Sequence, residues 1–342
     1  MKIALDATYS LGRNLSGVGV YCQAILKGLA EAHPEAEYLF CYRPHRFLRS
    51  ISCPLPRNAH RRLLGKSRAP SADLFHGLNQ RIDSARHRHA VSTFHDLFVL
   101  SGEYSTPEFR QRFAAQARLA AERSDLIIAV SQFTATQVEQ LLKVERARIR
   151  VIRHGVRPPP EKLDPAQREK IILFAGALQL RKNIIRLVEA FEGTAPGWKL
   201  ILAGSSGFGA AEILERIKSS PRSQDIQALG YVSDDVLETL YARASVFAFP
   251  SLDEGFGMPL LDAMARGVPV LTSNVSAMPE VAGDAALLVN PFDVASISSG
   301  LNQLTGNPEL RKELIQNGLK RSREFSWTTA VQQTWQVYRE LV

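Results

Sequence analysis

Residues 249–265 read FPSLDEGFGMPLLDAMA. This stretch predicts a buried strand that ends at Pro250, a glycine-rich turn, and a helix with Pro259 in its first turn, where a proline loses no hydrogen bond. The first backbone N–H groups of a helix have no partner within the helix and lie at its positive end. We therefore expect the amides of Gly257 and Met258 to point toward a ligand beyond the strand.

Glu254 directly precedes this turn. A carboxylate only accepts hydrogen bonds, so an acid at this place suits the hydroxyl groups of a ligand better than a phosphate. The alternative, from the residues alone, is that Glu254 caps the helix or is a solvated loop acid.

The rest of the chain repeats the same order of strand and then helix. Short apolar runs that fit buried parallel strands lie at 2–7, 37–42, 73–76, 90–95, 125–130, 149–152, 170–175, 199–203, 226–229, 246–250, 268–272 and 286–289. Amphipathic stretches between several of them predict helices, for example at 20–32, 109–123 and 132–142. This order implies an α/β fold of doubly wound parallel sheets, whose ligands bind beyond the carboxyl ends of the strands. Two such sheets that face each other would hold the ligand in the cleft between them.

The chain of 342 residues is long enough for two domains. Its residues 154–160 read HGVRPPP, and consecutive prolines cannot continue a helix or a central strand. We therefore expect an N-terminal Rossmann-like domain at 1–157 and a C-terminal one at 158–326. A last helix at 327–342 lies beyond the final strand and can cross back to the first domain.

The composition is typical of a globular protein, with 45% hydrophobic and 22% charged residues. No apolar run approaches the roughly 18 residues of a membrane span, and Asp6 interrupts the only apolar run that could begin a signal peptide. The cysteines Cys22, Cys41 and Cys53 are odd in number and have no C-x-x-C spacing, so we expect thiols that are mainly buried. These features predict a cytoplasmic protein.

The charge is unevenly distributed along the chain. Residues 1–160 hold 24 Lys and Arg against 13 Asp and Glu, a net charge of +11, whereas residues 161–342 hold 18 against 21, a net charge of −3. This asymmetry predicts an anionic partner for the first half.

Residues 43–68 concentrate this positive charge beside apolar side chains. The cations are Arg43, Arg46, Arg49, Arg57, Arg61, Arg62, Lys66 and Arg68, and the apolar residues are Phe47, Leu48, Ile51, Leu55, Leu63 and Leu64. Such a stretch fits peripheral docking on the anionic inner-membrane surface, and a solvated basic loop is the alternative. Nucleic acid is expected to bind only non-specifically.

The stretch 249–265 resembles the Glu-x7-Glu signature of the retaining glycosyltransferases of family 4, which have the GT-B architecture of two facing Rossmann-like domains. Other similar segments are GALQLRKN (176–183), LAG (202–204), LGYVSD (229–234), LYARAS (240–245), SAMPEVAG (276–283) and FSW (325–327), and more thinly SGVGVY (16–21), TFHDL (93–97) and AVSQFT (129–134). The resemblance covers residues 171–341 densely. Residues 272–280 look most like bacterial polysaccharide mannosyltransferases.

The resemblance implies a hexosyltransferase that needs neither a metal ion nor a cofactor. It would move a hexose, with GDP-mannose as the first expectation, from a nucleotide-diphosphate sugar to a hydroxyl of a saccharide or lipid-linked acceptor. Donor contacts are expected from Gly17, Gly19, Gly176, Gly255, Phe256, Gly257, Met258 and Asp262.

Asp262 stands where the family usually has its second Glu. In the family that acid is expected to hold the ribose hydroxyls of the nucleotide. Because Asp is one methylene shorter, a direct contact with the ribose is open. The alternative is an acid on the helix surface, favoured by its place near the N-terminus of the helix.

Arg181 and Lys182 lie between a predicted strand and the amphipathic helix 183–191. Two cations at the positive end of a helix call for an anion nearby, and a donor diphosphate would supply it. Fixed cations stabilise the charge that grows on a leaving phosphate. From the residues alone, a solvated Arg–Lys pair is the alternative.

His95 ends a predicted strand, and the resemblance makes it a donor-sugar contact near the reacting carbon. The alternative is a structural histidine that bonds to a backbone carbonyl. Ser16–Gly19 follows the first strand, and its two glycines allow close backbone approach with exposed amides. We expect this segment to form part of the phosphate and acceptor floor, with a plain turn as the alternative. The expected catalytic residues are thus His95, Glu254, Arg181 and Lys182.

No metal site is expected, because the sequence lacks Asp-x-Asp and because His87 and His89 have no acidic or thiol companions at ligand spacing. Two other functions stay open: a sugar-nucleotide epimerase of the same architecture and a non-catalytic nucleotide-sugar-binding protein. A dinucleotide oxidoreductase is disfavoured, because Gly17-Val-Gly19 lacks the third glycine and the ribose-binding acid.

Overall fold

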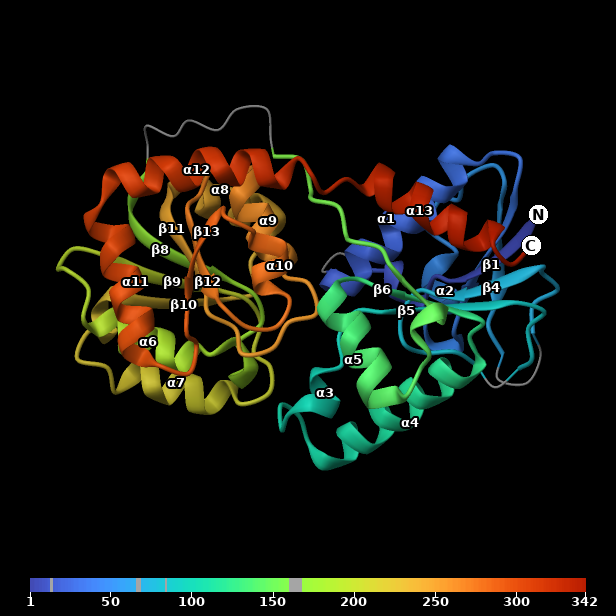
Figure 1. Cartoon of the computed structure of the whole chain (residues 1–342), viewed down its shortest axis with the longest axis horizontal. Coiled ribbons are helices and arrows are strands. Elements are labelled where there is room, and N and C mark those ends of the chain that lie inside the picture. Colours follow the sequence, from blue (N-terminus) through green and yellow to red (C-terminus); the bar gives the residue numbers. More distant parts are fainter. Residues whose placement is uncertain (13–14, 66–68, 84, 160–167) are drawn as a thin grey trace. The chain divides into compact units, whose positions relative to one another are not determined.

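The computed structural model describes residues 1–12, 15–65, 69–83, 85–159 and 168–342. Lys66 and Arg68 of the basic stretch lie outside these residues. The chain forms two compact units, Met1–Gly155 with Ser326–Val342, and Val156–Phe325. Figure 1 shows the helices and strands of both units.

The first unit contains a seven-stranded parallel sheet. Its strands in chain order are β1 (Lys2–Asp6), β2 (Glu37–Tyr42), β3 (Ala59–Leu63), β4 (Leu74–Gly77), β5 (Ala90–Phe94), β6 (Leu126–Ala129) and β7 (Ile149–Val151). Their order in the sheet is β3-β2-β1-β4-β5-β6-β7, so the winding direction reverses between β1 and β4. This is the doubly wound topology.

Helices cover both faces of this sheet. They are α1 (Gly17–Ala32), α2 (Pro44–Ser50), α3 (Phe98–Ser101), α4 (Pro107–Arg123), α5 (Gln132–Leu142) and α13 (Trp327–Arg339), with 3-10 turns at η1 (Thr8–Ser10) and η2 (Arg146–Arg148). The helices α1 and α13 pack together on one face, whereas α4 and α5 lie on the other (Figure 1). The side chains of β1 alternate between the two cores, with Ile3 and Leu5 in one and Ala4 in the other. A strand buried on both faces is expected to be apolar throughout.

The second unit contains a six-stranded parallel sheet. Its strands are β8 (Glu169–Ala175), β9 (Lys199–Ala203), β10 (Ile226–Gly230), β11 (Ala244–Phe249), β12 (Val270–Ser273) and β13 (Ala286–Val289). Their order is β10-β9-β8-β11-β12-β13, so the winding direction reverses between β8 and β11.

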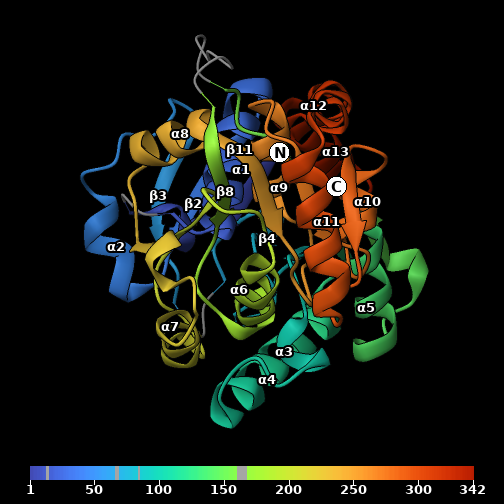
Figure 2. The ribbon, with the colours of Figure 1, turned by 90° about the vertical axis from the view of Figure 1, so that its left-hand side faces the viewer.

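The helices of the second unit also form two layers. They are α6 (Ile184–Glu192), α7 (Ala210–Lys218), α8 (Asp234–Arg243), α9 (Met258–Ala265), α10 (Met278–Ala282), α11 (Val294–Gly306) and α12 (Pro308–Ser322), with 3-10 turns at η4 (Leu180–Lys182) and η5 (Ser223–Asp225). One layer is made of α7, α6 and α11, and the other contains α8, α9 and α12 (Figure 1 and Figure 2).

The predicted fold class is confirmed, because each unit is a doubly wound parallel sheet. The prediction missed one strand, β3, which lies inside the basic stretch 43–68. Its residues Ala59–Leu63 include a histidine and two arginines, so they lack the apolar run of a central strand; β3 is an edge strand. Among the described residues, no helix combines the length and the apolar character that crossing a membrane requires.

Candidate donor site in the second unit

The point where the winding direction of the second sheet reverses lies between β8 and β11. Ligands of doubly wound sheets bind beyond the carboxyl ends of the strands at such a point. The segment after β8 carries Arg181 and Lys182, and the segment after β11 carries Glu254. The sequence motifs 176–183 and 249–265 therefore meet at the edge of the sheet where a ligand is expected.

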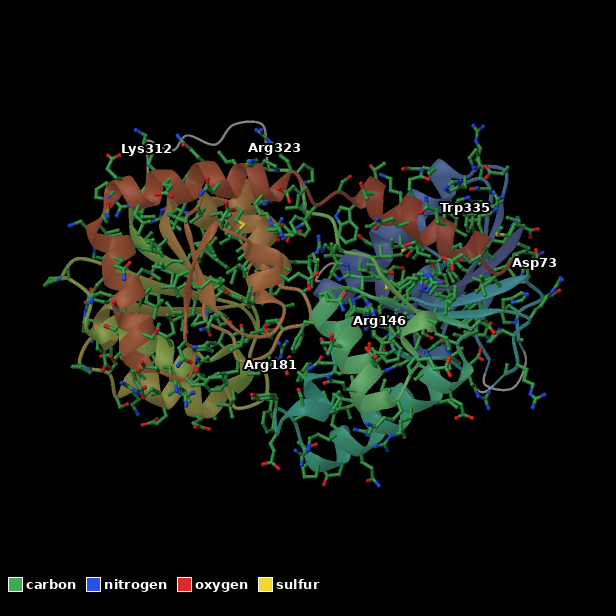
Figure 3. The ribbon with its side chains drawn as sticks, in the orientation of Figure 1. Asp73, Arg146, Arg181, Lys312, Arg323 and Trp335 are labelled. Atoms are coloured by element: carbon green, nitrogen blue, oxygen red, sulfur yellow. The ribbon has the colours of Figure 1, made fainter. Side chains whose placement is uncertain are left out.

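Glu254 lies between the two cations. Its Oε1 accepts a hydrogen bond from Nη1 of Arg181 at 2.8 Å and a second one from Nζ of Lys182. The guanidinium of Arg181, labelled in Figure 3, also donates to the carbonyl of Asp253 at 2.9 Å. The Nζ atom of Lys182 lies 4.6 Å from the ring centroid of Phe249, the last residue of β11. The backbone joins the two segments as well, because the amide of Leu252 donates to the carbonyl of Arg181 at 2.8 Å.

The three charged side chains of this cluster are largely withdrawn from solvent: 12% of Arg181, 9% of Lys182 and 10% of Glu254 is exposed. Burial raises the pKa of the Glu254 carboxyl, but Arg181 and Lys182 outweigh burial and hold this pKa below its ordinary value. Glu254 is therefore ionised at neutral pH. The alternatives of a solvated Arg–Lys pair and of a solvated or capping Glu254 are wrong, because the three groups are buried together and α9 has no side-chain cap.

Asn183 is a site residue that the sequence analysis used only as the start of a helix. Its side-chain Nδ2 donates to the carbonyls of Pro250, at 3.0 Å, and of Pro291, at 2.7 Å. Its backbone has φ 60°, a left-handed conformation that Asn tolerates better than most residues. Asn183 thus ties the end of the Arg181–Lys182 turn to the segments after β11 and β13. The sequence signal that could have identified Asn183 is an asparagine between a cationic turn and an amphipathic helix.

Glycines bring the strand ends close together. A Cβ added to Gly204, after β9, would lie 1.9 Å from the carbonyl oxygen of Gly176, after β8, so these two backbones can touch only without a side chain. Gly257 has φ 93°, and a Cβ there would also lie 2.5 Å from Cε of Met278. Both positions require glycine for physical reasons.

The turn before α9 is buried, with Phe256 only 4% exposed. Gly255 is also buried, whereas Met258, the first residue of α9, is half-buried. No described side chain caps α9, so the amide of Met258 lies at the positive end of the helix, where a ligand anion can accept from it. Pro259 has no N–H, and the amide of Leu260 donates to the carbonyl of Gly257 at 3.0 Å.

Asp262 lies one turn into α9 and is buried, so the alternative of an acid on the helix surface is wrong. Its Oδ2 is 3.0 Å from Nη2 of Arg157, and its Oδ1 is 3.6 Å from Nη1 of Arg266. Arginines therefore contact both oxygens of this carboxylate. The expected contact with a ribose is not tested by this arrangement.

His95 belongs to the first unit and follows β5. Its Nε2 lies 3.0 Å from the carbonyl oxygen of Leu78, so Nε2 carries a proton and donates it. Its Nδ1 lies 3.4 Å from Nε2 of His154, and the two rings stack with centroids 5.3 Å apart. Burial lowers the pKa of His95 to about 4, so its imidazole is neutral. This bond to a backbone carbonyl is the one that the structural alternative for His95 predicts.

A second histidine lies in the same buried region. His76 contacts the hydroxyl of Tyr338 at 2.6 Å through Nδ1 and that of Thr93 at 2.8 Å through Nε2. Thr93 also contacts the hydroxyl of Tyr21, 2.9 Å away, and the ring of Tyr21 packs edge-on against His95 with centroids 4.7 Å apart. Strands β4 and β5 and helices α1 and α13 thus share one buried hydrogen-bonded cluster.

Gly17 and Gly19 also belong to the first unit, but they do not form an open turn. They begin α1, and the side chain of Ser16 caps this helix by accepting from the amide of Gly19 at 3.3 Å. Gly17 is exposed, whereas Gly19 is buried, and a Cβ on Gly19 would lie 3.0 Å from the carbonyl oxygen of Tyr9. The alternative of a plain turn is wrong, because the segment is the capped first turn of a helix. The expected part of Gly17 and Gly19 in a phosphate and acceptor floor stays a prediction.

The described part of the basic stretch folds as α2 and the edge strand β3, so the alternative of a basic loop is wrong. Phe47 and Leu55 pack against the core and Leu64 is buried, whereas three apolar side chains are exposed: Leu48 by 78%, Ile51 by 59% and Leu63 by 56%. Several of the expected docking cations are engaged: Arg43 pairs with Asp6 at 3.2 Å, Arg61 donates to the carbonyl of Cys53 at 2.7 Å, and Arg62 donates to the carbonyl of Arg61 at 3.0 Å. The exposed part of the stretch is thus smaller than its composition suggested.

The described residues include no group of three or more His, Cys, Asp or Glu side chains that could hold a metal ion. His87 pairs with Asp83 at 2.8 Å and stacks on Phe75, with ring centroids 4.2 Å apart. His87 thus has an acidic neighbour after all, within a buried pair.

Two family profiles match the two halves of the chain. The profile of Glycosyl transferases group 1 matches residues 159–321, and that of Glycosyltransferase Family 4 matches residues 8–158. The O-antigen chain mannosyltransferase B of Escherichia coli is 33% identical over 284 residues, which cover 78% of this chain and 74% of that protein. The chain belongs to the family 4 glycosyltransferases.

Other relatives and solved structures agree with this family. A serotype-specific mannosyltransferase WbdA of Escherichia coli is 31% identical over 259 residues, 69% of this chain; the matched region makes up 32% of WbdA. Sucrose-phosphate synthase from Thermosynechococcus elongatus superposes with a TM-score of 0.79 at 20% identity, covering 99% of this chain and 98% of that one. Anabaena HepE in complex with UDP-glucose superposes with a TM-score of 0.76 at 18% identity, covering 99% of this chain and 100% of that one. These structures establish the GT-B architecture for this glycosyltransferase.

Proposed function

We propose that this glycosyltransferase transfers mannose from GDP-mannose to a hydroxyl of a growing cell-surface saccharide, with retention of the anomeric configuration. The observation that carries this proposal is the buried cluster of Arg181, Lys182 and Glu254 at the reversal point of the second sheet. The names of two relatives, both mannosyltransferases and one of them acting on O-antigen chains, support the sugar and the acceptor class.

In this proposal the cations bind the diphosphate of the donor. As the bond between the anomeric carbon and the phosphate oxygen breaks, negative charge grows on the leaving diphosphate, and fixed cations stabilise that charge. Glu254 orients the two cations and accepts hydrogen bonds from sugar hydroxyls. The acceptor hydroxyl attacks the anomeric carbon on the face that the phosphate leaves, and a phosphate oxygen takes the hydroxyl proton.

The remaining site residues have supporting roles. The amide of Met258 at the start of α9 and the backbone at Gly176 and Gly255–Gly257 receive the phosphates. His95 is neutral, so near the sugar it would act as a hydrogen-bonding group and not as a cation. Gly17 and Gly19 would contribute through the start of α1.

A donor panel tests the proposal. The protein is incubated with GDP-mannose, UDP-glucose or dTDP-rhamnose, without and then with a mannose-containing acceptor, and nucleotide release is followed by chromatography. We expect slow hydrolysis of GDP-mannose alone and faster release with acceptor, both greatly reduced in Glu254→Gln. Turnover of only a UDP-sugar would overturn the donor assignment, epimerised sugar nucleotide without acceptor would indicate an epimerase, and binding without turnover would indicate a sensor.

We also propose that the enzyme docks on an anionic membrane, where a lipid-linked acceptor would lie. The docking patch comprises Leu48, Ile51 and Leu63 with Arg46, Arg49, Arg57 and Arg62. Leu48 and Ile51 are three residues apart at the end of α2 and therefore share a face. Residues 38–72 contain no Asp or Glu, so no acid within this stretch offsets the cations. Exposed leucine and isoleucine can enter the interface while each cation adds about 1 kcal/mol at an anionic surface.

Co-sedimentation with liposomes over a salt series tests this docking. We expect binding to phosphatidylglycerol vesicles that weakens with salt, falls in Leu48→Gln/Ile51→Gln and in Arg49→Gln/Arg57→Gln/Arg62→Gln, and is unchanged in the exposed control Leu214→Gln. Binding that ignores lipid charge and salt, or that survives both sets of substitutions, would exclude the patch as a membrane contact.

A further inference from the structure

Both ends of the second unit attach to the segment Glu254–Asp262. The chain enters this unit at Val156 and leaves it at Phe325, and the amide of Val156 donates to the carbonyl of Phe325 at 3.2 Å. The ring of Phe325 packs edge-on against Phe256, with centroids 5.8 Å apart. Phe256 lies in the turn that directly follows Glu254.

The segment by which the chain enters the second unit makes a second contact with Glu254–Asp262, through Arg157. Its Nη2 lies 3.0 Å from Oδ2 of Asp262 on α9, and its Nη1 lies 3.5 Å from Oδ1 of Asp234 on α8. The side chain of Asp262 is only 9% exposed, whereas that of Arg157 is 34% exposed. The carboxylate of this salt bridge is therefore buried, and loss of Arg157 would leave that buried charge without its hydrogen-bonding partner, which is costly.

Arg266, the second arginine near Asp262, does not form a hydrogen bond with the Asp262 carboxylate as Arg157 does. It binds Glu238 with two hydrogen bonds, one of them 2.6 Å long, and its guanidinium lies 5.3 Å from the ring centroid of Tyr241. Its distance to Oδ1 of Asp262 is 3.6 Å, longer than a hydrogen bond. Arg266 thus has its own acid and donates to the backbone carbonyl of Asp262 at 2.9 Å, whereas among the described residues Arg157 is the cation that hydrogen-bonds the Asp262 carboxylate.

We infer that Arg157 is a positioning residue of the donor site, and that the carboxylate of Asp262 serves to hold Arg157 and does not bind the ribose of the nucleotide. A single pair then fixes the start of the second unit to α9, the helix whose first turn receives the donor phosphates. Phe325 and Phe256 fix the end of the same unit to the turn before that helix. Arg157 lies outside the Glu-x7-Asp motif, so the motif alone does not reveal it.

The shorter side chain fits this role. The buried Asp262 carboxylate already accepts a hydrogen bond from Arg157 and therefore has fewer acceptor positions left for the hydroxyl groups of a ribose. In Asp262→Glu the carboxylate moves by one methylene and must lose its present geometry with Arg157. We therefore expect Asp262→Glu to weaken the pair; the motif alone predicts unchanged or tighter donor binding.

The test combines a double-mutant cycle with a nucleotide that lacks the 2′- and 3′-hydroxyl groups of the ribose, and its nucleotide part rests on the proposed function. Wild type, Arg157→Gln, Asp262→Asn and the double variant are titrated by calorimetry with GDP, UDP and 2′,3′-dideoxy-GDP. We expect each single variant to bind GDP about tenfold more weakly and the double variant no more weakly than either. The ratio of the GDP and dideoxy-GDP affinities should be the same in wild type and Asp262→Asn. Arg157→Lys should recover part of the loss, and Arg243→Gln, which breaks the exposed pair with Glu169, should bind as wild type does.

Loss of that ratio in Asp262→Asn would show that Asp262 binds the ribose and would overturn the inference. Additive losses in the double variant would do the same, because residues that act through one pair cannot add. If wild type binds none of the nucleotides, the proposed function fails, and thermal unfolding of the same four proteins still decides. Each single variant should then unfold about 5 °C or more below wild type with no further drop in the double variant, and independent shifts would exclude the pair.

Discussion

Each unit buries a polar cluster, but the two clusters differ in charge. In the second unit, Arg181, Lys182 and Glu254 are buried as ions, and the neighbouring cations lower the pKa of Glu254 against the effect of burial. In the first unit, burial lowers the pKa of His76 to about 3 and that of His95 to about 4, so both rings stay neutral.

The difference in charge distinguishes a cluster that fits a ligand-binding site from a cluster that stabilises packing. Keeping ions away from water costs free energy unless they are paired, so a buried charged cluster at a ligand-binding edge is favoured where it acts on a charged ligand. Neutral imidazoles that are hydrogen-bonded to Thr93, Tyr338 and the Leu78 carbonyl instead fix the packing of β4, β5, α1 and α13. We therefore propose that the charged cluster of the second unit carries the chemistry, whereas the neutral cluster of the first unit fixes packing and offers a ligand only uncharged hydrogen-bonding groups.

The largest effect is expected from removing a cation of the charged cluster. Lys182→Ala and Arg181→Ala should each lower kcat by about 100-fold or more, because the transition state loses a fixed positive charge beside the leaving diphosphate. Steady-state rates with the donor identified by the panel measure this effect. Lys218→Ala, an exposed lysine at the end of α7, is the matched control. Near-normal rates in both folded variants would place the diphosphate elsewhere.

The neutral cluster should make the first unit sensitive to acid. The pKa of His76 and that of His95 are lower in the folded protein than the ordinary value of 6.5, which applies to the unfolded chain. As the pH falls below 6.5, the unfolded chain therefore binds more protons than the folded protein does. The free energy of unfolding should then decrease by up to about 1.4 kcal/mol per pH unit for each histidine, down to about pH 4 for His95.

Tryptophan fluorescence can follow this unit separately. Of the three tryptophans, Trp327 and Trp335 lie in the first unit and Trp198 in the second, so Trp198→Phe reports on the first unit. We expect its urea midpoint to fall between pH 6.5 and 5. A midpoint that stays constant over this range would mean that the histidines are not buried in neutral form.

The sequence allowed the fold to be predicted because apolar runs and turn residues are local signals. All twelve predicted strands are present: three have the predicted bounds, at 37–42, 199–203 and 286–289, and the other nine differ by one or two residues at one or both ends, as Ala90–Phe94 does from its prediction at 90–95. Strand β3 was not predicted, because an edge strand can carry polar residues such as His60, Arg61 and Arg62, which lack the apolar pattern of a buried strand. Glu254, Arg181 and Lys182 could be proposed because the motifs 176–183 and 249–265 each lie at the carboxyl end of a predicted strand.

The partners of the site residues could not be predicted, because they come from distant parts of the chain. Arg157 meets Asp262 across 105 positions, and Asn183 meets Pro291 across 108 positions. The sequence shows each residue but not that the fold of the second unit brings them together. The same holds for Gly17 and Gly19, where a glycine pair reads as an open turn and only the cap by Ser16 reveals a helix start.

A smaller effect should follow from loosening the charged cluster without removing a charge. Asn183→Ala leaves the buried carbonyls of Pro250 and Pro291 without their side-chain donor and places alanine in a left-handed conformation. We expect the second unit to lose about 1–3 kcal/mol of stability and the peptides around 181–184 and 250–252 to exchange hydrogen faster. Asn183→Gly separates the two causes, because glycine accepts the conformation but not the hydrogen bonds. Unchanged exchange in both variants would show that Asn183 does not tie these segments together.

Chelation of divalent ions is expected to have no effect on the transfer rate. In the proposed mechanism Arg181 and Lys182 supply the positive charge that a divalent ion supplies in other phosphate-transferring sites, and Lys182 is held by Phe249 and Glu254. Transfer rates with excess EDTA should therefore equal those without it, and added Mg²⁺ or Mn²⁺ should not raise them. The comparison becomes sharper in Lys182→Ala: if a metal ion can replace the missing ammonium, Mg²⁺ would restore part of the rate in that variant alone. Loss of wild-type turnover with EDTA, recovered by either ion, would mean that the two cations do not suffice and that the donor diphosphate is bound with a metal ion.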